Sequence, residues 1–391
     1  MKRVLVLDAS QRSALAVTRS LGRQGIPVFT ADEHTTSLAG CSRYSKQYLN
    51  YPSPRLHPDA FVTAIIRHCG LHDINIVFPM TELTTALLLR NKASLSDITI
   101  PWPDLESVDS LADKSTLMRL AGSLGVPVPH TWYVDNPADL PCDLATLPYP
   151  LVLKPAKSWL KPKDEWIRSS VRVANNPEDA LRFLESDPAF RKQPFLLQEH
   201  VSGDGEGVFA LYDHGKPLTF FAHRRLREKP PGGGVSVLSE SIPVNPELLI
   251  HARSLLDSAG WHGVAMVEFK VSEDGTPYLM EINTRFWGSL QLAIDAGIDF
   301  PWLLYRLACG EPVDPNADYR TGIRLRWLLG DLDSLYLTLR DRKFYSRRDK
   351  FRAVIRFITP SFFRTRHEVF RRDDPGPFWC EIKKYVQDII S

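Results

Sequence analysis

A short β-hairpin near the middle of the chain is the feature that most constrains its fold. Residues 263–286 read GVAMVEFKVSEDGTPYLMEINTRF. The dipeptide Asp274-Gly275 is favoured in two-residue turns, and runs of Val, Phe, Tyr, Met and Ile flank it. Pairing about that turn places Glu268 directly opposite Glu281, with the two Cβ atoms about 4.5–5.5 Å apart. Two carboxylates at that separation repel one another, so the pair predicts a cation between them.

The residues after Glu281 continue the same face of the strand. Because side chains alternate between the faces of a strand, Asn283 and Arg285 follow Glu281 at period two. Glu, Glu, Asn and Arg on one face are the groups that Mg²⁺ and a polyphosphate need. The alternative is a pair of solvated glutamates on an exposed face. Apolar neighbours favour the first interpretation because they indicate strands buried on one side: Met266, Phe269, Leu279, Met280, Ile282, Phe286 and Trp287.

Length and composition indicate an ordinary globular protein of more than one domain. The 391 residues are too many for one typical core and predict two or three domains. Five cysteines occur without CxxC spacing, so we expect reduced thiols in a cytoplasmic protein rather than disulfides or a zinc site. The first apolar run ends at Asp8, too early for a signal peptide, and no run of 18 apolar residues could span a membrane.

The first 108 residues alternate strand and helix patterns. Such alternation predicts a parallel sheet with right-handed crossovers, and ligands of such sheets bind beyond the carboxyl ends of the strands. The turn after the first strand reads DASQRS rather than GxGxxG, which disfavours a dinucleotide cofactor. The pattern predicts strands at 3–9, 26–32 and 74–80 and helices at 13–25, 59–72 and 82–91.

Beyond residue 112 the predicted elements are more varied. Four prolines between 136 and 150 indicate a loop or linker. Strands are expected at 149–156, on both sides of a turn within 195–213, and at 216–229, followed by the loop PPGGGV; helices are expected at 115–125, 176–187 and 246–260.

Two lysines in this region each have an ordinary explanation. Lys154 ends an apolar strand, where a lysine usually extends into solvent. Lys114 lies in the first turn of a helix, where the helix dipole disfavours a cation, so an anion beside it would explain its position better. The order of the polar residues along the chain changes this interpretation: Lys114, Lys154, Glu199, Glu206, Arg225, Glu268, Glu281, Asn283, Arg285.

That order resembles the ATP-grasp superfamily, and specifically the carboxylate–amine ligase type related to carbamoyl-phosphate synthase and biotin carboxylase. The resemblance covers about residues 1–310 and is strongest at MEINTRFWGS and the two lysines. It implies α/β and α+β architecture: a Rossmann-like pre-ATP-grasp domain at 1–108 and an ATP-grasp domain at 109–318. The second domain would have two subdomains, with a lid at about 115–197. A basic, mostly helical C-terminal extension would occupy 319–391.

The resemblance also implies roles for individual residues. ATP and Mg²⁺ (or Mn²⁺) would be the cofactors. Arg285 would contact the transferred phosphate or the substrate carboxylate, and Arg224, Arg225 and Arg227 are candidates for the γ-phosphate contact. By the resemblance, ATP is bound by Lys114, Lys154, Gln198, Glu199, His200, Val201 and Glu206. The two lysines would contact phosphates, the main chain of the hinge at Glu199 and Val201 would meet adenine, and Glu206 would bind the ribose hydroxyls. Metal would be held by Glu268, Glu281 and Asn283, and the catalytic arginines would be Arg225 and Arg285.

The activity implied is a ligase that converts a substrate carboxylate into an acyl phosphate for attack by an amine. Small-molecule carboxylate and amine substrates are therefore expected, and arginines at 168, 225, 227 and 285 suggest that they are anionic. The alternatives are a carboxylase or kinase-like enzyme with a non-amine acceptor, and a nucleotide-binding protein without turnover. The sequence departs from the family after Lys154, where KPAKSWLKPKDEW lacks glycine; either Lys157, Ser158 and Lys161 cover the phosphates or the lid is longer.

The C-terminal region carries most of the positive charge. From Arg320 to Ser391 there are 17 Lys or Arg and 9 Asp or Glu, a net charge of +8 in a chain whose total is +2. Basic and apolar residues alternate in RDRKFYSRRDKFRAVIRFI, which is compatible with peripheral contact to an anionic membrane. Packing on the body and homodimer formation are the other interpretations, and nucleic acid is disfavoured because no RNA-binding module is present.

Overall fold

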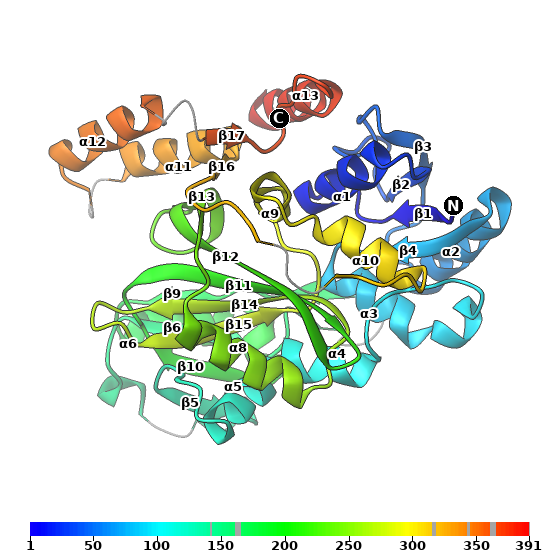
Figure 1. Ribbon diagram of the computed structural model, residues 1–391. Helices are drawn as coiled ribbons and strands as arrows, with labels where there is room; N and C mark the ends of the chain where they lie inside the picture. Colours follow the sequence, from blue (N-terminus) through cyan, green and yellow to red (C-terminus); the bar gives the residue numbers. More distant parts are fainter. Residues whose placement is uncertain (141–142, 161–165, 315–317, 342–344, 360–364, 391) are drawn as a thin grey trace.

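A computed structural model describes residues 1–140, 143–160, 166–314, 318–341, 345–359 and 365–390 (Figure 1). The N-terminal domain contains one parallel sheet of order β3-β2-β1-β4. Helices α1, α2 and α3 connect or follow its strands, as the alternation of apolar patterns predicted. The elements are β1 (Arg3–Val6), α1 (Arg12–Arg23), β2 (Val28–Asp32), β3 (Ser45–Asn50), α2 (Pro58–His72), β4 (Ile74–Phe78) and α3 (Glu82–Arg90).

Strand β3 was not predicted from the sequence. Its residues SKQYLN are mostly polar and mostly exposed, because β3 is an edge strand. An edge strand with little apolar surface does not show the run of Val, Ile and Leu that identified β1, β2 and β4.

A second sheet is antiparallel, with order β5-β10-β6-β9. It has its own apolar core, which includes Leu151, Leu153, Phe190 and Phe195 and is separate from the main core. Helix α5 leads into it after α4. The elements are η1 (Lys92–Leu95), α4 (Leu105–Ala112), α5 (Lys114–Ser123), β5 (Thr131–Val134), η2 (Leu144–Thr146), β6 (Leu151–Pro155), β7 (Trp159–Leu160), β8 (Ile167–Arg168), β9 (Arg172–Ala174), α6 (Pro177–Ser186), α7 (Pro188–Lys192) and β10 (Phe195–Glu199).

The largest sheet has seven strands in the order β15-β14-β11-β12-β13-β16-β17. Helix α8 packs on this sheet with Leu248, Ala252 and Leu255 buried. Helices α9 and α10 follow the hairpin formed by β14 and β15. The elements are β11 (Asp204–Asp213), β12 (Lys216–Lys229), β13 (Val235–Ile242), α8 (Pro246–Ser258), β14 (Gly263–Val271), β15 (Pro277–Asn283), α9 (Leu290–Ala296) and α10 (Phe300–Ala308).

The C-terminal region is mostly helical, and it also contains two short strands that the sequence did not predict. Strands β16 and β17 are three residues each, and both extend the seven-stranded sheet. Their shortness and their arginines hid them among the basic residues. The elements are β16 (Arg324–Arg326), α11 (Leu328–Arg340), α12 (Arg347–Ile358), β17 (Thr365–His367) and α13 (Gly376–Ile390).

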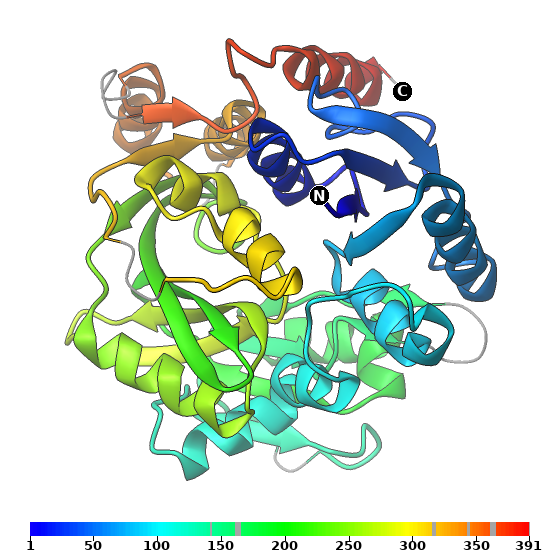
Figure 2. The same ribbon diagram turned by 45° about the vertical axis from the view of Figure 1, so that its right-hand side comes forward.

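Part of the C-terminal region packs on the N-terminal domain, as Figure 2 shows for α13 beside β2 and β3. The Arg19 Nε atom of α1 lies 2.8 Å from Asp374 Oδ2, and both side chains are buried. Arg12, also on α1, pairs with Glu368. Thus the two ends of the chain are joined by buried ion pairs. Within the described residues, no helix is long and apolar enough to cross a membrane.

Candidate functional site

The two glutamates of the central hairpin face one another as predicted. Glu268 on β14 is directly opposite Glu281 on β15. The turn is different from the prediction, because Ser272 N donates to Thr276 O at 3.0 Å and three residues rather than two form the loop. The longer loop shifts the register by one residue, and a β-bulge at Met280 shifts it back. The two deviations cancel at the site.

Arg225 is the arginine of β12 that reaches these carboxylates. Its Nη2 pairs with Glu268 Oε2, and its Nη1 lies 3.2 Å from Glu228 Oε1. Burial raises the pKa of Glu268, and the charge of Arg225 offsets this only partly. The two neighbouring arginines, which the sequence also left as candidates for the γ-phosphate contact, pair elsewhere: Arg224 with Glu240 and Arg227 with Asp331.

Lys114 and Lys154 both lie beside Glu281. Lys114 begins α5, and its Nζ is 3.8 Å from Glu281 Oε2, so the anion that would explain a cation at a helix N-terminus is present. Burial acts to raise the pKa of Glu281, but Lys114 and Lys154 outweigh burial and leave this pKa below its ordinary value. The site is therefore organised around an ionised Glu281.

Lys154 is the more strongly perturbed of the two lysines. It lies on β6 with 9% of its surface exposed, and its Nζ is 3.9 Å from Met280 Sδ. Burial lowers the pKa of Lys154 to about 8, with the charge of Lys114 acting in the same direction and that of Glu281 against it. A cation held under these conditions favours a bound anion, because an anion would supply the missing charge compensation.

Asn283 and Arg285 extend the same face. Asn283 Nδ2 donates to Glu281 Oε1 at 3.2 Å, which confirms that the two side chains share a face. Arg285 adds to the positive charge around Glu281, and its Nη1 donates to Phe286 O at 3.0 Å. Between them, Thr284 O accepts from Trp102 Nε1 at 2.9 Å, which ties the end of β15 to the segment before α4.

The hinge residues predicted to meet adenine end β10 and begin a loop. Gln198 is buried and its Nε2 donates to Thr131 Oγ1 at 2.9 Å, so its side chain supports the sheet. Glu199 is exposed, and His200 lines a cavity. Val201 follows His200 in the loop. Of the four hinge residues, His200 thus lines the cavity, while the Gln198 side chain supports the sheet.

Glu206 is not brought together with the other predicted residues. In the pairing of β11 with β14, Gly207 is opposite Glu268 and Glu206 is opposite Phe269. Because successive side chains lie on opposite faces, Glu206 projects from the face away from Glu268. Its partner on β12 is Arg224. The geometry gives no support to the expected contact between Glu206 and ribose.

A cavity of about 930 Å³ is lined by Arg225, whose guanidinium pairs with Glu268. One side is formed by the hinge loop, including His200 and Gly203, by Gly205 at the start of β11, and by Arg225. The other side is formed by α11 and α12, with Arg352 and Arg356 among the lining residues. The C-terminal region, which lay outside the family resemblance, therefore forms a wall of this cavity.

Lys270 is a site residue that sequence reasoning missed. It lies on the face of Glu268 at period two, lines the cavity, and contributes to the lowered pKa values of Lys154 and His200. The alternation of β14 could have identified it. Of the residues predicted to cover the phosphates, Lys157 lies 3.0 Å from Asp109 Oδ2 on α4. Lys161 and the side chain of Arg168 lie outside the described residues.

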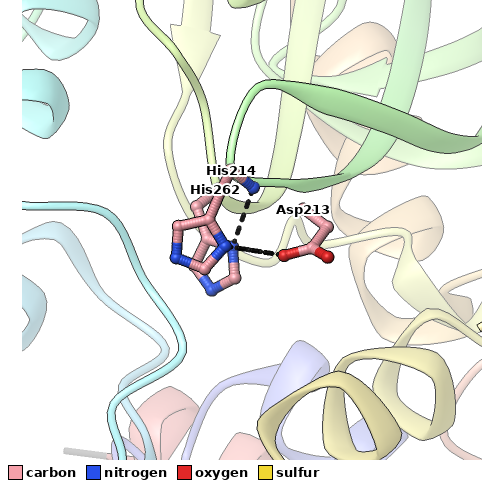
Figure 3. Close-up of side chains that lie close together, drawn as sticks. All are labelled: Asp213, His214 and His262. Atoms are coloured by element: carbon pink, nitrogen blue, oxygen red, sulfur yellow. Dashed lines mark hydrogen bonds and ion pairs between the residues drawn. The ribbon is translucent and has the colours of Figure 1, made fainter. Parts of the chain in front are cut away.

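A separate polar cluster occupies the β11–β12 turn (Figure 3). Asp213 Oδ1 is 2.7 Å from His214 Nδ1 and 3.6 Å from His262 Nδ1. The backbone N–H of His214 also donates to His262 Nδ1 at 3.3 Å. The three residues therefore contact one another. The cluster lies at the opposite end of β11 from Asp204 and the cavity, about 30 Å away at ~3.3 Å per residue, so it is not part of the candidate site.

Comparison with solved structures identifies the fold. The N5-carboxyaminoimidazole synthetase of Staphylococcus aureus aligns with a TM-score of 0.65 and 15% identity, covering 85% of this chain and 84% of that one. A biotin carboxylase–β,γ-ATP complex from Campylobacter jejuni gives 0.64 and 14%, covering 83% and 74%. An L-amino acid ligase from Bacillus licheniformis gives 0.60 and 18%, covering 79% and 74%. The chain therefore has the ATP-grasp fold.

Sequence comparison agrees. Residues 191–330 match the family model described as "ATP-grasp in the biosynthetic pathway with Ter operon". The uncharacterized protein y4rH of Sinorhizobium fredii is 25% identical over 246 residues, which cover 60% of this chain. The chain spans about half the length of that relative, 49%. Family model and fold together place this protein in the ATP-grasp superfamily, as the order of its polar residues indicated.

Proposed function

We propose that this protein is a Mg²⁺- and ATP-dependent ligase that joins a carboxylate to an amine. The observation that carries the proposal is the opposed pair Glu268 and Glu281 surrounded by Lys114, Lys154 and Arg225. Alternating negative and positive groups of this kind suit a metal ion bridged to a polyphosphate. The expected cytoplasmic location and homodimer are part of the same proposal.

The donor atoms fit the proposed metal. Glu268, Glu281 and Asn283 offer carboxylate and amide oxygens from one sheet face, and hard oxygen donors are what Mg²⁺ and Mn²⁺ prefer. These three residues would hold the metal, which would neutralise charge on the phosphate oxygens.

The chain's own residues would do most of the remaining work by position and charge. Lys114 and Lys154 would bind phosphate oxygens, and Arg225 and Arg285 would stabilise charge on the transferring phosphoryl group. The cavity beyond Arg225 would bind the acceptor. Since an acyl phosphate is already activated, attack by an amine requires orientation and exclusion of water rather than a protein nucleophile.

The first experiment is isothermal titration with a non-hydrolysable ATP analogue, with and without Mg²⁺. Glu281→Ala should weaken Mg²⁺-dependent binding by roughly 10- to 100-fold, since a charge-assisted contact contributes about 1.5–3 kcal/mol. Glu206→Ala is the matched control, because it removes a carboxylate from the other face of the same sheet. Wild-type protein that does not bind the analogue, or equal losses in the two variants, would contradict the proposed site.

A second experiment addresses the reaction. Release of ADP should require both a carboxylate and an amine, and the coupled product should contain both. The relatives named as a biotin carboxylase and an N5-carboxyaminoimidazole synthetase make the alternative acceptor worth testing. ADP release with bicarbonate and no free amine substrate would favour the carboxylase alternative over the ligase.

A further inference from the structure

Helix α12 has one face that nothing in the described part of the molecule covers. It runs from Arg347 to Ile358 at an edge of the molecule (Figure 1), and none of its residues is buried. Phe351, Ile355 and Ile358 have the spacing i, i+4, i+7, which places them on one stripe. Their exposed fractions are 66%, 45% and 62%. Large apolar side chains this exposed on one helix face usually mark an interaction surface.

The opposite face of α12 is already used. Arg227 Nη1 donates to Arg356 O at 3.0 Å, and Arg326 Nη2 donates to Phe357 O at 3.0 Å. Ala353 and Phe357 line the cavity beside Arg225. Packing on the body, one of the interpretations left open by the sequence, therefore accounts for the inner face and leaves the apolar stripe outward.

The charge of α12 indicates what covers the stripe. The helix carries five cations and one acid, a net charge of +4. Arg347 and Arg348, both exposed, precede Phe351 by four and three residues and so border the stripe. By contrast, α13 also exposes apolar residues, but its Lys383 and Lys384 are balanced by two acids. An apolar stripe bordered by arginines is complementary to anionic lipid headgroups above an acyl layer.

We propose that α12 docks this protein on the surface of an anionic membrane, with Phe351, Ile355 and Ile358 inserted among the lipids. Arg347 and Arg348 contact the headgroups. The helix lies in the membrane plane. Because its inner face lines the cavity, docking holds this cavity within about one helix diameter, ~10 Å, of the lipid surface.

The test is co-sedimentation of the full chain with vesicles. Wild-type protein should bind phosphatidylcholine vesicles containing about 30% phosphatidylglycerol, and should bind pure phosphatidylcholine at least about tenfold more weakly. Replacing Arg347 and Arg348 with Gln should weaken binding to the anionic vesicles about 30-fold, at about fivefold per cation. Raising the salt from about 0.15 M to about 0.5 M should have a similar effect.

The apolar contribution has a matched control. Ile358→Ser on α12 should weaken vesicle binding about tenfold. Ile250→Ser removes an isoleucine of nearly equal exposure, 63%, from α8 at a distant surface, and should leave binding unchanged. Circular dichroism and thermal unfolding show whether each variant is folded.

Two results would overturn the proposal. One is failure of the folded wild-type chain to bind anionic vesicles. The other is a combination of two observations: light scattering shows a concentration-dependent dimer that Ile358→Ser abolishes, and Ile358→Ser and Ile250→Ser bind vesicles equally well. This combination would assign the stripe to a second copy of the chain. Neither result bears on nucleotide binding, which the Glu281→Ala titration measures separately.

Discussion

Lys154 gives a prediction in which stability and ligand binding change in opposite directions. Its side chain is buried, and its pKa is about 8 against the ordinary lysine value of 10.5. The difference corresponds to about 3 kcal/mol, at about 1.4 kcal/mol for each pH unit. At pH 7 the folded protein therefore holds a charge whose burial is unfavourable. Lys154→Met keeps an unbranched side chain of similar length and removes that charge.

We expect Lys154→Met to raise the free energy of unfolding of the ligand-free protein by about 3 kcal/mol at pH 7. Since the folded pKa lies below the unfolded one, the unfolded wild type binds more protons between pH 8 and pH 10.5, and its stability rises with pH in that window. The advantage of the variant should consequently fall to about 1 kcal/mol at about pH 9.5. The same variant should bind the ATP analogue at least about tenfold more weakly.

Urea unfolding at the two pH values measures the first effect, and isothermal titration measures the second. Lys216→Met is the control, because Lys216 is exposed, and its effect should stay within about 0.5 kcal/mol at both pH values. A Lys154→Met variant that is less stable than wild type at pH 7, or whose advantage does not change with pH, would refute the reasoning.

Two further predictions concern the frame of the site. Asp374→Asn should lower the free energy of unfolding by about 3–5 kcal/mol in urea titrations, because it leaves the charge of the fully buried Arg19 unpaired. The double variant Arg19→Met, Asp374→Leu should recover most of that loss. An equal loss of stability in the double variant would speak against an ion-pair effect. Gly203→Ala should destabilise the hinge loop and lower the melting temperature, because φ of Gly203 is +149° and a Cβ there would lie 2.1 Å from Val271 O. Gly122→Ala in helix α5 is the control: its Cβ would meet nothing within 4 Å, so this variant should not lower the melting temperature.

The sequence predicted the centre of the site better than its surroundings. Glu268, Glu281 and Asn283 were placed correctly because strand alternation is local and strict. The agreement at Glu281 depends on two deviations that cancel, the longer turn and the bulge at Met280. Neither deviation leaves a clear mark in the residue pattern, since Asp274-Gly275 suits loops of two or three residues.

Features that depend on distant contacts were not predictable in the same way. Alternation could have placed Glu206 on the opposite face from Glu268 only if the pairing of β11 with β14 had been known. The wall formed by α11 and α12 depends on β16 joining β13, a contact between segments about 85 residues apart. Short, arginine-rich strands such as β16 and β17 carry too little apolar pattern to be found alone.

The four-stranded sheet has its own apolar core, separate from the one that unites the rest of the chain. Only one face of the sheet has this independent core, because Leu196 of β10 is buried in the main core; a tilt of the sheet as a rigid body therefore has to move at Leu196 but leaves the second core intact. The buried ion pairs between α1 and the C-terminal region act against such tilting elsewhere. We therefore expect admission and release of nucleotide to occur by a swing of this sheet, carrying Lys154 toward or away from Glu281, while the first domain and the C-terminal region stay fixed to one another.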